Sequence, residues 1–238
     1  MRTQHIIPAI IPDSLEHLTM RIREVRDVAM RVQIDVMDGT YAPTTSWPYS
    51  GIERDRFEAI RREDEGLPYW QDVEFEIDLM VQKPEERIEE WALAGAACLI
   101  IHADSTDALE RIFTECADRR VEVALAVSPS TNLQLIEPYV TSAVFVQCMG
   151  NDRIGRHGVP LDPRTYDVVS TIRKRWPTIP IGVDIGVNEE TIPSLIEAGA
   201  TRFAAGSAVF GGGDAKHAFT TLETMTRELL NDTSENDE

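Results

Sequence analysis

Strand-like and helix-like segments alternate along this chain, and eight short runs rich in β-branched and apolar residues recur with mixed polar and apolar segments between them. The expected strands span His5–Ile11, Arg31–Val36, Val73–Leu79, Cys98–His102, Val121–Val127, Ser142–Cys148, Ile179–Asp184 and Thr201–Ala205. The expected helices include Ser14–Ala29, Pro84–Ala94, Thr106–Asp118, Asp162–Trp176 and Glu189–Ala198. Alternation with short connections is typical of a parallel sheet, and eight units predict its closure into an α/β fold, the (β/α)8 TIM barrel.

The length of 238 residues suits one barrel domain, which we expect over residues 1–230. Residues 231–238 are acidic and contain no apolar anchor, so we expect them to form a frayed tail. A doubly wound open sheet would also alternate strands and helices and is the alternative fold. No G-x-G-x-x-G pattern follows the first expected strand, which favours the barrel.

The composition excludes several classes of protein. No apolar run reaches the length of a membrane span, and the N-terminus lacks a basic segment followed by an apolar one, so we expect a soluble, cytoplasmic protein. A formal net charge of −18 disfavours nucleic-acid binding, and any anionic ligand must be held by local groups. Cys98, Cys116 and Cys148 lack C-x-x-C spacing and are expected to be packed thiols.

Two carboxylates stand at the ends of expected strands, Asp35 at the second and Asp184 at the seventh. In a parallel barrel both would project into the same mouth. One could remove a proton from a carbon acid while the other supplies a proton on the opposite face. The two longest connections, 39–51 and 149–161, leave strands at the same mouth, and we expect them to act as lids.

Four motifs follow the expected strands. Residues 35–39 read D-V-M-D-G, residues 78–85 read D-L-M-V-Q-K-P-E, residues 183–188 read V-D-I-G-V-N and residues 205–211 read A-G-S-A-V-F-G. In these motifs and their order the chain resembles, over nearly its whole length, the ribulose-phosphate 3-epimerase family of the ribulose-phosphate-binding barrels. The family has D-V-M-D-G at the first motif, H-L-M followed shortly by N-P at the second, and V-D-G-G-V-N and A-G-S-A-I-F-G at the last two. The resemblance implies an isomerase that epimerises a ketose phosphate, such as D-ribulose 5-phosphate, and a homo-oligomer.

The chain also departs from the family pattern. In the family, a divalent metal is held by two aspartates and two histidines, and the same aspartates act as acid and base. Asp35 and Asp184 match those aspartates, whereas Gln33 and Asp78 stand at the histidine positions. Ala9 replaces a family serine, and residues 150–158 differ from the family's N-P-G-F-G-G-Q loop. We therefore expect a divergent member.

The expected metal ligands carry only oxygen donors. They are Gln33, Asp35, Asp78 and Asp184. Such a set suits magnesium or manganese better than zinc. Three converging carboxylates repel one another, and a bound cation is the simplest relief. The alternative is that Asp78 turns to a neighbouring arginine or lysine and that no metal binds.

The resemblance also implies substrate contacts. Met37 and Met80 match methionines that line the reacting centre in the family, although a core role is the alternative for both. His102 ends the fourth expected strand and is either a substrate contact or a core histidine. Gly155 and Gly158 of the loop after the sixth strand are further expected contacts.

A phosphate group can be held by backbone N–H groups at glycine-rich turns, and this superfamily places its phosphate after strands seven and eight. The expected cradle consists of Gly186, Gly206 and Ser207. Ile185 replaces a family glycine, so we expect it to weaken the cradle by blocking close backbone approach. Arg153 and Arg156 could compensate as side-chain clamps, the alternative being solvated loop charges.

Two other functions compete with epimerisation. Aldolases or decarboxylases of the superfamily, such as hexulose-phosphate synthase, carry a D-x-K-x-x-D signature, but residues 76–81 read E-I-D-L-M-V and lack the lysine. A non-catalytic barrel that binds a sugar phosphate and has lost its metal site is the remaining alternative. The absence of both family histidines and of the serine is the feature that favours it.

Overall fold

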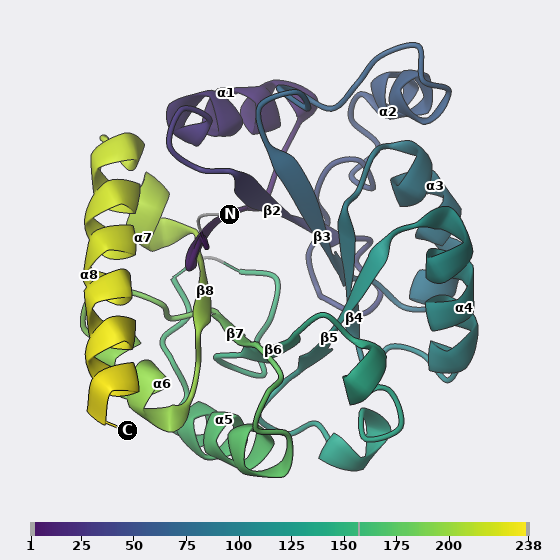
Figure 1. Cartoon of the computed structure of the whole chain (residues 1–238). Coiled ribbons are helices and arrows are strands. Elements are labelled where there is room, and N and C mark those ends of the chain that lie inside the picture. The colour runs from purple at the N-terminus through teal and green to yellow at the C-terminus, as the bar shows by residue number, and fades with distance from the viewer. Residues whose placement is uncertain (1–2, 157, 237–238) are drawn as a thin grey trace.

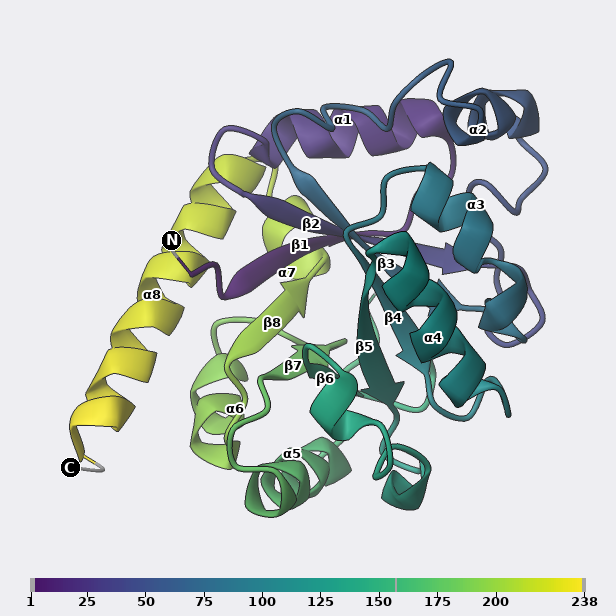
Figure 2. The same ribbon diagram turned by 45° about the vertical axis from the view of Figure 1, so that its right-hand side comes forward.

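In the computed structural model, which describes residues 3–156 and 158–236, eight parallel strands close into a barrel in sequence order (Figure 1). The strands are β1 (Ile6–Ile10), β2 (Arg31–Met37), β3 (Glu74–Met80), β4 (Cys98–His102), β5 (Glu122–Val127), β6 (Val146–Met149), β7 (Ile181–Asp184) and β8 (Arg202–Ala205). The helices are α1 (Leu15–Val25), α2 (Arg54–Arg61), α3 (Ile88–Leu93), α4 (Leu109–Arg119), α5 (Arg164–Arg175), α6 (Ile192–Ala198), α7 (Ser207–Phe210) and α8 (Ala215–Asn236). Figures 1 and 2 show the helices around the outside of the strands.

The pairing of β1 confirms the predicted single-domain TIM barrel and excludes the open sheet. β1 pairs in parallel with β2 on one side and with β8 on the other, where Ile7 is in register with Ala204. The strands read as nearly continuous apolar runs because side chains on both of their faces are buried, as parallel sheets require.

The outer helices follow from local signals in the sequence. Ser14 caps α1, and its Oγ accepts a hydrogen bond from the backbone N–H of His17 at 3.0 Å. Leu18, Ile22 and Val25 recur at helical spacing and are fully buried against the barrel. Among the described residues, no helix has both the length and the apolar character needed to cross a membrane.

The amino-terminal end of the barrel interior holds a buried ion network. Glu76, near the start of β3, is fully buried and accepts hydrogen bonds from Arg31 (3.0 Å) and Arg202 (2.5 Å). The Arg202 guanidinium also lies 3.6 Å from the centre of the Phe145 ring. These side chains fill the barrel interior between the amino-terminal parts of the strands.

The three cysteines are packed thiols, as predicted. Cys98, Cys116 and Cys148 are free and buried. Burial raises the pKa of Cys116 and of Cys148 to about 12, so both thiols stay protonated and unreactive.

The end of the chain differs from the expected frayed tail over residues 231–238. Helix α8 continues through Asn236, so the first six residues of that stretch are helical. None of these six residues is glycine or proline, so nothing in the sequence interrupts the helix that precedes them. Residues 237–238 lie outside the described part of the chain.

Candidate active site

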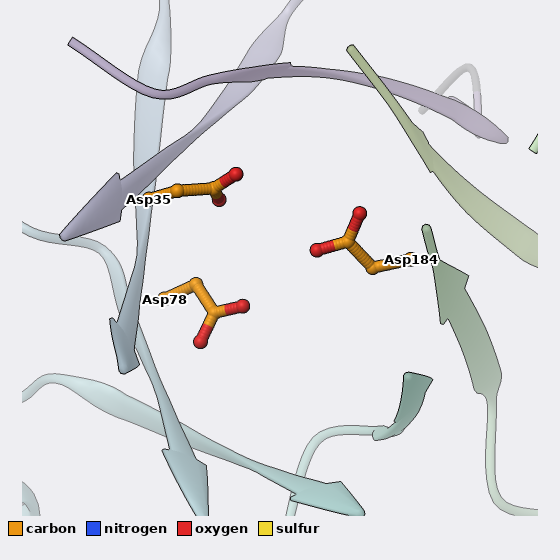
Figure 3. Close-up of side chains that lie close together, drawn as sticks. All are labelled: Asp35, Asp78 and Asp184. Atoms are coloured by element: carbon orange, nitrogen blue, oxygen red, sulfur yellow. The ribbon is translucent and has the colours of Figure 1, made fainter. Parts of the chain in front are cut away.

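Three aspartates converge at the carboxyl end of the barrel (Figure 3). The register of β2 and β3 places Asp35 beside Asp78, and Asp184 ends β7 across the barrel. Each carboxylate offers an oxygen within 4.8 Å of an oxygen of the other two. Their exposed fractions are 6%, 0% and 8%, so water screens the repulsion between them poorly. The structure therefore brings together the three predicted acidic residues.

Gln33 links two of these carboxylates. Its Nε2 donates to Asp35 Oδ1 at 2.7 Å and to Asp184 Oδ2 at 3.1 Å. Its Oε1 is buried and has no hydrogen-bond partner in the described structure. Gln33 is therefore the fourth predicted residue that reaches the cluster, and it holds Asp35 and Asp184 toward each other.

Asp78 is held by a different pair of side chains. Its Oδ1 is 3.0 Å from His102 Nε2, and its Oδ2 accepts from Gln147 Nε2 at 3.2 Å. Among the described residues Asp78 therefore does not turn to an arginine or lysine, which was one part of the expected alternative. The partner residues come from β4 and β6, and both are almost completely buried. His102 is thus a core histidine that contacts the cluster.

The environment of the cluster favours retention of protons. Burial, followed by the charge of Asp78, raises the pKa of Asp184 to about 7. Burial and the charges of Asp184 and Asp78 raise the pKa of Asp35 well above its ordinary range. Both shifts favour retention of a proton in the cluster, and Asp184 titrates near neutral pH.

A cavity at the mouth connects Asp35 and Asp184, but not Asp78, to the glycine turns. Its lining includes Ala9, Asp35, Met80, Gly155, Arg156, Gly158, Asp184, Gly186, Gly206 and Ser207. Two of the three carboxylates and the predicted glycine turns therefore line one cavity. Three expected contact residues lie outside this lining. They are Met37, His102 and Arg153.

The position of each of these three residues outside the cavity lining has a local cause. Met37 is buried beneath the loop after β6, where a Cβ added to Gly155 would lie 2.6 Å from the Met37 sulfur. The ring of His102 packs against the ring of Tyr41, with centroids 5.1 Å apart. Arg153 is exposed on the loop. Met37 is therefore buried outside the cavity, and Arg153 lies outside its lining.

The loops after β6 and β7 touch at a glycine. The backbone N–H of Gly150 donates to the carbonyl of Asp184 at 2.5 Å, and a Cβ on Gly150 would lie 2.0 Å from the carbonyl oxygen of Ile185. Ile185 has φ of +75°, a left-handed conformation that is rare for β-branched residues. Its backbone N–H donates to Asp184 Oδ1 at 2.7 Å. The turn therefore adopts a left-handed backbone conformation that is typical of glycine, although the residue is isoleucine.

Gln147 is the contact residue that the sequence analysis missed. It lies between apolar neighbours on β6 and points into the barrel toward Asp78. A lone amide inside a short apolar strand is the signal that could have identified it, whereas Gln33 was predicted from its place at a family histidine position.

Comparisons with known proteins agree with this geometry. The family model described as Ribulose-phosphate 3 epimerase family matches residues 5–210. Ribulose-phosphate 3-epimerase of Bacillus subtilis is 29% identical over 224 residues, covering 91% of this chain and 97% of the relative. The Schizosaccharomyces pombe protein of the same name is 27% identical over 206 residues, covering 86% of each chain.

Solved structures share the fold. A 3-hexulose-6-phosphate synthase superposes with a TM-score of 0.66 at 19% identity, covering 92% of this chain and 98% of that one. Orotidine 5'-monophosphate decarboxylase from Sulfolobus solfataricus gives a TM-score of 0.63 at 14% identity, covering 96% and 100%. At such identities the similarity establishes the barrel architecture alone.

Proposed function

Because the chain belongs to the ribulose-phosphate 3 epimerase family, a family of carbohydrate isomerases, we propose that it interconverts D-ribulose 5-phosphate and D-xylulose 5-phosphate, or the two epimers of a related ketose phosphate. The observation that carries this proposal is the convergence of Asp35 and Asp184 from opposite sides of one buried cavity. The same cavity contains the glycine turns after β7 and β8.

The two carboxyl groups would exchange roles between the forward and reverse reactions. The ionised aspartate removes the proton from C3, beside the ketone, and the electron pair moves into an enediolate. The protonated aspartate then returns a proton to C3 on the opposite face. Their raised pKa values support this cycle because both shifts favour retention of a proton in the cluster. Each such group contributes about 10²- to 10⁴-fold in rate.

A divalent cation fits the donors that are present. Asp35, Asp78 and Asp184 would hold it, and the unpartnered Oε1 of Gln33 could join them if the amide rotates. An all-oxygen set favours magnesium or manganese over zinc. When bound, such an ion would stabilise negative charge on the enediolate oxygens.

The phosphate group would lie at the turns after β7 and β8. Gly186, Gly206 and Ser207 line the same cavity as Asp35 and Asp184, and their backbone N–H groups would hold a dianion without net positive charge. Arg156 lines the cavity, so we assign a side-chain clamp to Arg156 and none to Arg153, which lies outside the lining.

The remaining substrate contacts follow from the lining. Met80, Gly155 and Gly158 face the cavity and would contact the sugar. We assign no direct substrate contact to Met37 or His102, which are buried outside it.

Turnover of D-ribulose 5-phosphate in the presence of Mn²⁺, followed by NMR, tests the proposed function. We expect xylulose 5-phosphate to form, and Asp35→Asn and Asp184→Asn each to reduce kcat by about 10²- to 10⁴-fold, since each removes one proton-transfer group. Asp118→Asn, on the exposed side of α4, is the matched control and should leave kcat unchanged. Binding of pentulose and hexulose phosphates without turnover would contradict the proposal and indicate a non-catalytic barrel.

A further inference from the structure

Asp78 stands at a position where its carboxylate should be unstable. It is fully buried beside two other carboxylates, and within the described structure it forms no ion pair with arginine or lysine. An isolated buried carboxylate next to like charges would turn away or take up a proton. Figure 3 shows that its side chain instead projects into the same barrel interior as those of Asp35 and Asp184.

Two hydrogen bonds account for this orientation. His102 Nε2 lies 3.0 Å from one oxygen of Asp78, and Gln147 Nε2 donates to the other oxygen at 3.2 Å. A carboxylate oxygen can accept about two hydrogen bonds, so each oxygen keeps a lone pair for another partner. Both oxygens are therefore fixed in place without being fully occupied.

The donors are themselves held in place. The His102 ring is fully buried and packs against the Tyr41 ring at an interplanar angle of 56°. The Tyr41 hydroxyl donates to Asp104, which also accepts a hydrogen bond from Thr131 Oγ1 at 3.0 Å. A chain of contacts thus runs from the rim of the barrel through the Tyr41 ring to Asp78, and it limits rotation of the His102 ring.

We propose that His102 and Gln147 are positioning residues, which hold Asp78 in the cluster as a third acidic ligand for a divalent cation. This role rests on the proposed function, because it concerns the cation site of that reaction. Hydrogen-bonding partners behind a metal ligand fix its orientation, and their loss costs about 10- to 100-fold in metal affinity. Neither residue touches the substrate cavity, so their effect would pass through Asp78.

Calorimetric titration of metal-free protein with Mn²⁺ tests this role. His102→Phe keeps an aromatic ring beside Tyr41 but removes the N–H donor, and we expect Mn²⁺ affinity to fall about 10- to 100-fold. His102→Gln retains an N–H donor, and we expect it to recover most of that loss. His217→Phe makes the same change at an exposed position of α8 and should bind Mn²⁺ like the wild type.

Gln147→Met provides a second route to the same result if His102→Phe does not fold. It preserves side-chain length, removes the amide donor to Asp78 Oδ2, and should also weaken Mn²⁺ binding about 10-fold or more. The inference would be overturned if the folded variants bound Mn²⁺ with unchanged affinity, or if His102→Phe and His102→Gln lost the same amount of Mn²⁺ affinity. It would also be overturned if the wild type did not bind Mn²⁺.

Turnover measured in parallel separates this inference from the proposed function. If the wild type is an active epimerase and His102→Phe and Gln147→Met bind Mn²⁺ as tightly as the wild type does, the positioning role alone is overturned. If those variants bind Mn²⁺ more weakly but the wild type turns over no ketose phosphate, the positioning role is supported and the proposed function is overturned.

Discussion

At the scale of single residues, the three carboxylates of the cluster differ in their partners. Asp35 and Asp184 share the amide of Gln33, whereas Asp78 is held by His102 and Gln147. The shared amide keeps the first two close but leaves them free to exchange protons. Separate hydrogen-bond partners therefore distinguish the two aspartates that we propose to transfer protons from Asp78.

The raised pKa of Asp184 predicts a pH dependence of stability in metal-free protein. Folding raises this pKa from its ordinary value of 3.8 to about 7, so the folded chain binds the proton more tightly. The stability contributed by this carboxyl is fully present below about pH 4 and is lost as pH rises through about 7. Between about pH 5 and pH 8 the loss should be about 2 kcal/mol.

Urea denaturation with chelator present, at both pH values, measures this loss. Asp184→Asn cannot titrate, so its free energy of unfolding should fall about 2 kcal/mol less than that of the wild type over the same interval. Asp118→Asn is exposed and should follow the wild type. Equal pH dependence in Asp184→Asn and the wild type would show that the folded chain does not raise the pKa of Asp184.

At the scale of the elements, the site depends on close contact between the loops that follow β6 and β7. Gly150 connects to the backbone of both loops, since its N–H donates to Asp184 and its carbonyl accepts from Asp162 at 2.6 Å. The first of these hydrogen bonds involves the backbone of a proposed catalytic residue. The geometry of Asp184 is therefore coupled to the loop after β6.

Gly150→Ala should consequently impair catalysis. Its methyl group would lie 2.0 Å from the carbonyl oxygen of Ile185, so the two loops must separate. We expect kcat/KM to fall by about 100-fold, because small displacements of catalytic groups carry costs of that order. Gly212→Ala is the matched control, since its methyl group would meet no atom within 4 Å. Steady-state kinetics of both variants measures this effect. A Gly150→Ala variant with the kcat/KM of the wild type would refute the coupling between Asp184 and the loop after β6.

At the scale of the whole molecule, the alternation of eight strands and helices was enough to predict the closed barrel and the mouth at which Asp35 and Asp184 meet. Helices α2 and α8 were not among the expected helices, and residues 231–236 of α8 were expected to fray because they contain no apolar anchor. The partners of Asp78 were also not predicted, since they depend on how β3, β4 and β6 align across the barrel.

The ion network at the barrel base should contribute to global stability. Glu76→Ala would leave the charges of Arg31 and Arg202 without their buried partner, and we expect a loss of about 3 to 5 kcal/mol in the free energy of unfolding. Glu74 pairs with the same Arg31 but its side chain is 62% exposed, so Glu74→Ala should cost at most about 1 kcal/mol. Similar losses in urea denaturation of the two variants would contradict this distinction.

Solvent exchange at C3 in D₂O tests most directly whether Asp35 and Asp184 act on opposite faces of one carbon. The wild type should incorporate deuterium at C3 of both D-ribulose 5-phosphate and D-xylulose 5-phosphate. Asp35→Asn and Asp184→Asn should each stop epimerisation, yet each should still exchange the C3 proton of one epimer, a different one in each variant. Exchange of the same epimer by both variants, or no exchange by the wild type with any ketose phosphate, would contradict a two-carboxylate mechanism.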